Sequence, residues 1–316
     1  MASNGKSDST DIELSFTDEE IKVLKYIGVS ENEVRDTVRI LQDWIRQQPH
    51  LPECAVSETK MLCRIWLSRK MSLERTKQTV DMYYTVRNLL PEFFENKDPV
   101  ILQKEQIFKH FQLIPMPNML DDFSQVIIDL YAGTEDQHFD LKQFMKTGIM
   151  INELLMRNSP ALGLHIVLDL KNFSLGVIKK LTPAFLKKMQ VIITKAYPTR
   201  LKSVHFVNAP VYVDKLVTLL KMVLIPKLSK RIIVHTSGLG SLHDHISPKY
   251  LPLEYGGELG PVQDIWDLWI KDLISKRDWF LEQENIRSDE EKRPGKPLDH
   301  SELFGMEGSF KKLSVD

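Results

Sequence analysis

The sequence predicts an α/β fold in which helices cover a mostly parallel sheet, preceded by a small all-helical N-terminal domain. Short, continuously apolar segments alternate with longer helical patterns through the middle of the chain. Strands that are apolar on both faces and alternate with helices are typical of a parallel sheet buried between helices. The first third of the chain, by contrast, has helical signals only. These observations predict two unlike regions in succession.

The first third is expected to form four helices. Capping-box patterns begin the first two, at Thr17 and at Ser30. The second helix carries its apolar residues on one face, at Val34, Val38, Leu41 and Ile45. Two further helices are expected at 57–69 and 73–90, and residues 92–99 join this region to the next.

The middle of the chain is expected to supply the sheet. Four apolar segments of strand length predict strands at 126–131, 164–168, 204–207 and 232–235. Helical patterns cover 140–156 and 177–196, and Pro183 interrupts the second.

The C-terminal part is expected to contain one amphipathic helix at 262–280. An extended strap or partial disorder is expected at 287–316. Three tryptophans in the helix predict that it docks onto its own domain. The expected division of the chain is a helical N-terminal domain at 1–95, a sheet-containing domain at 96–260 and a C-terminal helix with tail at 261–316.

Composition predicts an ordinary globular protein of a reducing compartment. The chain has 316 residues, of which 42% are hydrophobic and 27% charged. The two cysteines, Cys54 and Cys63, are expected as free thiols, and the apolar neighbours of Cys63 predict a buried one. The polar N-terminus predicts no signal peptide, and no window is long and apolar enough for a membrane span. A cytoplasmic protein is therefore expected.

The net charge of −1 conceals a basic segment. Residues 171–231 contain thirteen Lys and Arg residues and a single acid, Asp214. Basic residues usually just solvate a surface, but so few acids over this length predict a basic face. Such a face can meet phospholipid headgroups, a phosphoinositide or nucleic acid.

Residues 210–227 predict a helix with reversed amphipathicity. Its polar residues form one narrow stripe, and the rest of the surface is apolar: the stripe contains Asp214, Lys215, Thr218 and Lys221. A helix of this kind must be deeply buried or form the wall of an apolar cavity, because it is too short to span a bilayer.

Catalytic and metal-binding motifs are not found in the sequence. There is no nucleophile elbow, no phosphate-binding loop and no dinucleotide fingerprint. Asp169 could be catalytic at the end of a strand, but a carboxylate that caps the following turn is the favoured interpretation. The cluster His235, His243, Asp244 and His245 lacks the spacing of a structural zinc site. We therefore expect neither an enzyme nor a cofactor.

Several motifs occur in an order that resembles a known family: LERTKQTVDMYYTVRNLLPEFF at 73–94, LTPAFLKKM at 181–189, AYPTRLKSVHFVNAP at 196–210 and LPLEYGG at 251–257. The chain resembles the CRAL-TRIO family of lipid-binding proteins, which includes tocopherol and retinaldehyde carriers, and its tail is most similar to insect members. The resemblance implies a closed apolar pocket on one face of the sheet. It assigns 96–260 to the lipid-binding domain.

The resemblance also implies pocket residues, each of which could equally be ordinary core. They are Leu164, Ile166 and Leu168, then Leu181, Ile192, Ile193 and Tyr197, then Val204 and Phe206, and finally Val211, Leu216 and Leu220. The last three belong to the family's gate, carried over here to residues 211–225. This chain has Met222 and Val223 where many members have proline and phenylalanine.

The family's phosphoinositide-binding cleft carries over to Arg69, Arg200, Lys202, Lys227 and Arg231. Arginine suits this role because it can grip phosphate through two parallel hydrogen bonds. The resemblance thus implies an intracellular carrier of a retinoid, tocopherol, carotenoid or related isoprenoid. It would associate peripherally with phosphoinositides and anionic membranes, and not with nucleic acid. The alternatives are a phosphoinositide-sensing scaffold, a phospholipid transfer protein and an α/β enzyme.

Overall fold

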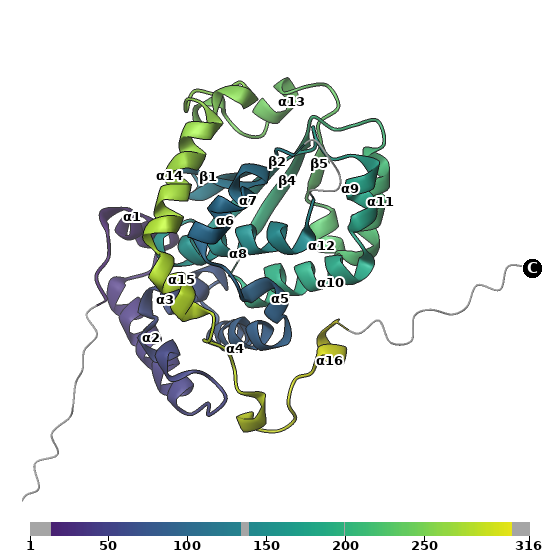
Figure 1. Cartoon of the computed structure of the whole chain (residues 1–316). Helices are drawn as coiled ribbons and strands as arrows, with labels where there is room; N and C mark the ends of the chain where they lie inside the picture. Colours follow the sequence, from purple (N-terminus) through teal and green to yellow (C-terminus); the bar gives the residue numbers. More distant parts are fainter. Residues whose placement is uncertain (1–13, 134–138, 199, 305–316) are drawn as a thin grey trace, which may run out of the picture.

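The computed structural model describes residues 14–133, 139–198 and 200–304, and it places one five-stranded sheet beside a helical N-terminal region (Figure 1). The strands lie side by side in chain order: β1 (Phe111–Met119), β2 (Ser124–Tyr131), β3 (Gly163–Asp169), β4 (Leu201–Val207) and β5 (Ile232–Val234). The pair β1–β2 is antiparallel and the other three pairs are parallel. The predicted fold class is confirmed.

The N-terminal region consists of helices: α1 (Asp18–Ile27), α2 (Glu31–Arg46), α3 (Thr59–Ser68), α4 (Leu73–Leu89), α5 (Pro91–Phe94), α6 (Pro99–Lys104) and α7 (Ile107–His110), with a short 3-10 turn, η1 (Glu53–Ser57), before α3. The capping box at Thr17 is complete, because Thr17 and Glu20 exchange side chain-to-backbone hydrogen bonds of 3.2 and 2.8 Å. The Ser30 hydroxyl accepts a bond from the Glu33 amide. The predicted apolar face of α2 is buried. The expected domain boundaries stay a prediction.

The structure contains strand β1, which the sequence does not predict. Its proline residues, Pro115 and Pro117, cannot donate to a sheet ladder and so argue against a central strand. The structure places β1 at the edge of the sheet, where only one side needs partners. Its register with β2 shifts between Pro115 and Met119. An edge position thus explains how a proline-containing segment can pair.

One face of the sheet is covered by a first group of helices: α8 (Leu141–Asn158), α9 (Leu175–Lys180), α10 (Pro183–Val191), the π-helical turn η3 (Ile192–Ala196), α11 (Val213–Val223) and α12 (Pro226–Ser229). The expected helix 177–196 is divided, because Thr182 caps a new helix with Pro183 in its first turn. The expected helix 210–227 is shorter than predicted. It begins at Val213, and Pro226 opens α12 instead of ending α11.

The opposite face packs against a second group: α13 (Gly240–His243), η4 (Pro248–Tyr250), η5 (Leu253–Tyr255), α14 (Val262–Ser275) and α15 (Arg277–Gln283). Trp266 is fully buried in this layer, and its indole N–H donates to the Phe108 carbonyl oxygen at 2.7 Å. Trp269 donates to the Pro115 carbonyl oxygen at 2.9 Å. These two tryptophans therefore dock α14 onto its own domain, as the sequence predicts. The single helix expected at 262–280 is divided at Lys276 into α14 and α15.

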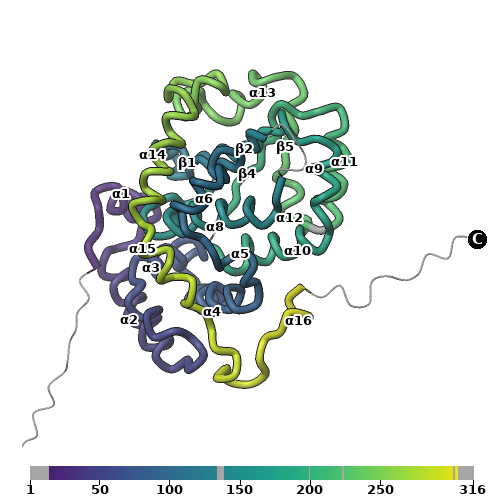
Figure 2. The backbone as a smooth tube through the Cα atoms, in the orientation of Figure 1, coloured from purple at the N-terminus to yellow at the C-terminus, as the bar shows by residue number. Residues whose placement is uncertain are grey.

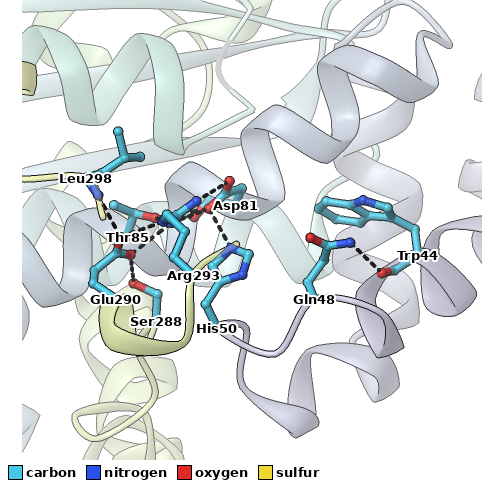
Figure 3. Close-up of polar contacts among 9 residues, drawn as sticks. All are labelled: Trp44, Gln48, His50, Asp81, Thr85, Ser288, Glu290, Arg293 and Leu298. Carbon is cyan, nitrogen blue, oxygen red and sulfur yellow. Dashed lines mark hydrogen bonds and ion pairs between the residues drawn. The ribbon is translucent and has the colours of Figure 1, made fainter. Parts of the chain in front are cut away.

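Residues 284–304 form a C-terminal strap that returns toward the N-terminal helices (Figure 2). It contains η6 (Glu290–Lys292) and ends in α16 (His300–Phe304), which packs against α10. Figure 3 shows its anchor, where the Arg293 guanidinium bonds Asp81 and Thr85 of α4 as well as Glu290 of the strap. The same Asp81 contacts His50. The expected strap is present to residue 304, and its remaining residues, 305–316, lie outside the described residues.

Candidate functional site

The sheet and the first group of helices enclose an apolar cavity of about 260 Å³. Alternate residues of a strand point to the same face of a sheet. Leu164, Ile166 and Leu168 of β3 therefore face the cavity together. Ile166 and Leu168 pair in register with lining residues of both β2 and β4, and Leu164 pairs with the lining residue Leu201 of β4. The strand part of the lining consists of Phe111, Gln112, Leu113, Ile127, Asp129, Leu164, Ile166, Leu168, Leu201, Val204, Phe206 and Ile232.

Helix α11 closes one side of this cavity. Leu216 and Leu220 lie on its buried face and line the cavity, and Leu224 at its C-terminal cap does so too. The polar stripe that the sequence identifies is exposed: Asp214, Lys215, Thr218 and Lys221. The reversed amphipathicity of this segment is thus the pattern of a helix that forms a cavity wall and exposes one narrow stripe to solvent.

The cavity brings together eleven of the twelve residues expected in a pocket. They are Leu164, Ile166, Leu168, Leu181, Ile192, Ile193, Tyr197, Val204, Phe206, Leu216 and Leu220. Val211 is not among them, and its side chain is 100% exposed. It precedes the first turn of α11, so the helical face that points inward begins only at Val213, which corrects the expected place of Val211 in the wall.

Two groups of lining residues were not assigned from the sequence. The first is aromatic and occupies the wall from β1, α8 and the loops after β2 and β3: Phe111, Phe139, Phe144 and Phe173. The second is polar: Gln112, Asp129, Thr147, Asn152, Gln190 and Thr194. A signal for Asp129 is visible in the sequence, because this carboxylate interrupts an otherwise apolar strand.

A buried polar cluster lies behind the cavity and joins it to the N-terminal helices. The Glu153 carboxylate of α8 accepts hydrogen bonds of 2.6 Å from both the Tyr83 and the Tyr197 hydroxyls. It also pairs with Arg87 of α4 and, at 2.8 Å, with Arg157. Burial alone would raise the pKa of Glu153, but the two guanidinium groups outweigh it and lower that pKa to about 2. The carboxylate is therefore ionised and fully paired.

Comparison with known proteins identifies the family of the chain. Residues 117–257 match the CRAL/TRIO domain, and residues 30–102 match the Pinta-like UBA domain. Clavesin-1 of Xenopus laevis is 30% identical over 243 residues, which cover 73% of this chain and 71% of that protein. The chain belongs to the CRAL/TRIO family. The lining described above lies largely within the matched CRAL/TRIO region.

Two further comparisons show how much of this CRAL/TRIO protein is similar to other known proteins. Clavesin-1 of Rattus norvegicus is 30% identical over 233 residues, or 71% of this chain. The matched region spans 64% of the length of that relative. The crystal structure of Sfh5 overlays with a TM-score of 0.45 at 17% sequence identity, over 83% of this chain and 100% of that one.

The five basic residues expected in a phosphoinositide cleft of this CRAL/TRIO protein have different environments. Lys227 and Arg200 are exposed and Arg231 is half-buried. Within the described residues these three form no ion pair with a carboxylate. Lys202 pairs with Asp122. Three of the five are thus free to meet an anion.

Arg69 has a structural role that the sequence did not suggest. Its guanidinium donates to the Thr79 hydroxyl at 2.7 Å and to the carbonyl oxygens of Thr194 and Tyr197 at 3.1 and 2.9 Å. These carbonyls lie at the end of the π-helical turn, where intrahelical partners are missing. Burial lowers the pKa of Arg69. Arg69 therefore holds the cavity wall to α4, which corrects the expected headgroup contact.

Three of the other polar candidates, Asp169, His235 and His243, also have structural partners. Asp169 accepts bonds from the Lys171 amide, the Asn208 side chain and the Tyr255 hydroxyl, so it caps the turn after β3. His235 bonds His205 and Ser241, whereas His243 bonds the Tyr255 carbonyl oxygen. Among the residues that the structure describes, no group of three or more His, Cys, Asp or Glu is placed to hold a metal ion.

The two cysteines are free, and Cys63 is buried as expected. Burial raises the pKa of the Cys63 thiol to about 11, which disfavours the reactive thiolate.

Among the described helices, none combines the length and the apolarity that crossing a membrane requires.

Proposed function

We propose that this protein binds one small hydrophobic lipid in the cavity and carries it between membranes, without chemical change to the lipid. The apolar cavity beneath α11 is the observation that supports this function. Each CH₂ group transferred from water to such a cavity contributes about 0.8 kcal/mol. An isoprenoid, such as a retinoid, tocopherol or carotenoid, could therefore bind with few polar contacts.

Helix α11 is the proposed gate. Val211, Met222 and Ile225 expose apolar side chains around it, with exposed fractions of 100, 69 and 43%. Exposed apolar groups beside cationic ones favour contact with an anionic membrane. Lys227 and Arg231 supply such cations directly after the gate. Movement of α11 at a membrane would connect the cavity to the lipid phase.

The cavity can be tested by extracting the purified protein with organic solvent and identifying lipids by mass spectrometry. We expect about one mole of a small hydrophobic lipid per mole of protein, in the same chemical form as in the membrane. We also expect the protein to accelerate transfer of a fluorescent isoprenoid between vesicles. Bound phospholipid would favour phospholipid transfer instead. A lipid-free protein that does not accelerate transfer would favour a scaffold and contradict the proposal.

The basic surface after the gate can be tested by charge reversal. Lys227→Glu combined with Arg231→Glu should weaken binding to phosphoinositide-containing vesicles by at least about thirtyfold. Each basic residue near an anionic surface contributes about 1 kcal/mol, and the two new carboxylates are repelled as well. Affinity for the cavity ligand should not change.

The matched control for this charge reversal is Lys271→Glu with Lys276→Glu. These residues are exposed on and directly after α14, on the other side of the sheet from α11 (Figure 1). This control should bind the vesicles as the wild type does. Unchanged vesicle binding by the Lys227 and Arg231 variant in a sedimentation assay would contradict the assignment of the membrane-facing surface.

A further inference from the structure

Asp129 is the one carboxylate in the described lining of the cavity. It lies on β2, directly opposite Leu113 of β1 and Leu168 of β3 in the sheet register. Both neighbours also line the cavity, so the Asp129 carboxylate shares their face of the sheet. The phenyl rings of Phe111, Phe139 and Phe173 belong to the same lining. An acidic side chain thus lies in a part of the cavity wall that is otherwise formed by leucine, isoleucine and phenylalanine.

The Asp129 carboxylate lacks a protein partner, as do two neutral polar atoms of the described lining, Thr147 Oγ1 and Gln190 Oε1. The side chains of Gln112, Asn152 and Thr194 each donate to a backbone carbonyl oxygen of their own segment. Tyr197 donates to Glu153. Within the described residues, the Asp129 carboxylate has neither a hydrogen bond nor an ion pair, and no Lys, Arg or His lines the cavity.

Burial of such a carboxyl group has an unfavourable free energy unless a group in the cavity pairs with it. Transfer of an unpaired polar group into an apolar environment costs several kcal/mol, and an ionised carboxylate costs more. Burial raises the pKa of Asp129 to about 7, so a large fraction of the molecules hold the proton at neutral pH. A protonated carboxyl has one donor and a free acceptor oxygen, and a hydroxyl group offers the same two functions.

We propose that Asp129 is the polar anchor of the cavity and that the ligand is a lipid alcohol, a hydrophobic molecule whose hydroxyl end pairs with this carboxyl. This inference rests on the proposed lipid-binding function. An ammonium group would have to leave water as a charged group with three donors to satisfy, whereas a hydroxyl enters the apolar wall as a neutral group. A fatty acid would place a second carboxylate beside the first, which like-charge repulsion disfavours. Hydrocarbons, ethers and esters offer no donor.

The test compares three ligands with one isoprenoid chain: geranylgeraniol, its methyl ether and geranylgeranic acid. Each competes with fluorescent retinol for the wild-type protein. We expect the alcohol to bind about tenfold more tightly than the ether, the preference that one hydrogen bond to a carboxyl group provides. The acid should bind more weakly than the alcohol, and its affinity should rise as the pH falls and Asp129 takes up its proton.

Two variants of Asp129 separate its hydrogen bonding from its charge. Asp129→Leu should abolish the preference for the alcohol, strengthen binding of the ether and raise the melting temperature of the ligand-free protein. Asp129→Asn keeps a donor and an acceptor, so it should retain a preference for the alcohol while improving binding of the acid. Leu168→Ile is the matched control at the same level of the sheet. It should change all three affinities together and leave their ratios intact.

The outcomes distinguish this inference from the proposed function. Equal binding of alcohol and ether by the wild type, or an unchanged ratio in Asp129→Leu, overturns the assignment of Asp129 and leaves lipid binding in place. A wild-type protein that binds none of the three ligands, nor retinol, overturns both.

Discussion

Glu153→Gln should lower the free energy of unfolding by about 3–5 kcal/mol, which is the cost of removing one charged partner from a buried ion pair. Glutamine has nearly the volume of glutamate, so the packing of α8 is kept and the change is electrostatic. It leaves the guanidinium of Arg87, whose side chain is 2% exposed, without its counter-charge. The Tyr83 and Tyr197 hydroxyls also lose an ionised acceptor. Chemical denaturation monitored by tryptophan fluorescence measures this loss.

Glu31→Gln is the matched control, because it removes the same charge from an exposed pair. Glu31 and Arg35 are 40 and 37% exposed and lie one turn apart on α2. Exposed pairs contribute 0–1 kcal/mol, so this variant should stay close to the wild type. Equal stability of the Glu153 and Glu31 variants would contradict the assigned role of the buried cluster.

The same cluster predicts acid sensitivity with a defined sign. The folded-state pKa of Glu153 is about 2, below its value in the unfolded chain. Its contribution is therefore fully present above about pH 4.5 and is lost as the pH falls toward 2. In Glu153→Gln this part of the acid destabilisation should be missing from a plot of unfolding free energy against pH.

Leu220→Asp should abolish retention of the cavity ligand. Leu220 is 8% exposed and lies on the cavity face of α11. A carboxylate there would be buried in an apolar wall without a partner, at a cost of several kcal/mol, or would force α11 away from the sheet. Either response opens the cavity to water. We expect affinity for a bound isoprenoid to fall at least a hundredfold in a fluorescence titration.

Thr218→Asp provides the control on the same helix. Thr218 belongs to the exposed polar stripe of α11, so the new carboxylate stays in water. This variant should retain ligand as the wild type does. Full retention by Leu220→Asp, at an unchanged melting temperature, would contradict the assignment of α11 as a cavity wall.

Local sequence signals predicted the parts of the fold that periodicity determines. The segments that form β2 to β5 are rich in apolar residues, and the sequence places each strand to within a few residues. The polar stripe on α11 predicted that its remaining surface must be covered, and the structure shows the cavity beneath it. Strand β1 was missed because its prolines are tolerated only at an edge, and edge position is a property of the whole sheet.

The site was less predictable wherever a role depends on contacts between distant segments. The basic character of Arg69 suggested an anion site, but carbonyl oxygens 125 and 128 residues away occupy its guanidinium. The carboxylate of Asp129 interrupts an apolar strand, yet only the register with β1 and β3 shows that it faces the cavity. Val211 lies in the gate segment by sequence, but a start of α11 two residues later leaves it in solvent.

The π-helical turn η3 has an evolutionary consequence. A π turn accommodates one residue more than an α turn, so its gain or loss corresponds to a single inserted or deleted codon within an otherwise intact helix. Ile192, Ile193 and Thr194 of this turn all line the cavity. A lineage can therefore reshape the cavity wall by one small insertion or deletion here and leave the sheet, the gate and the core of the domain unchanged.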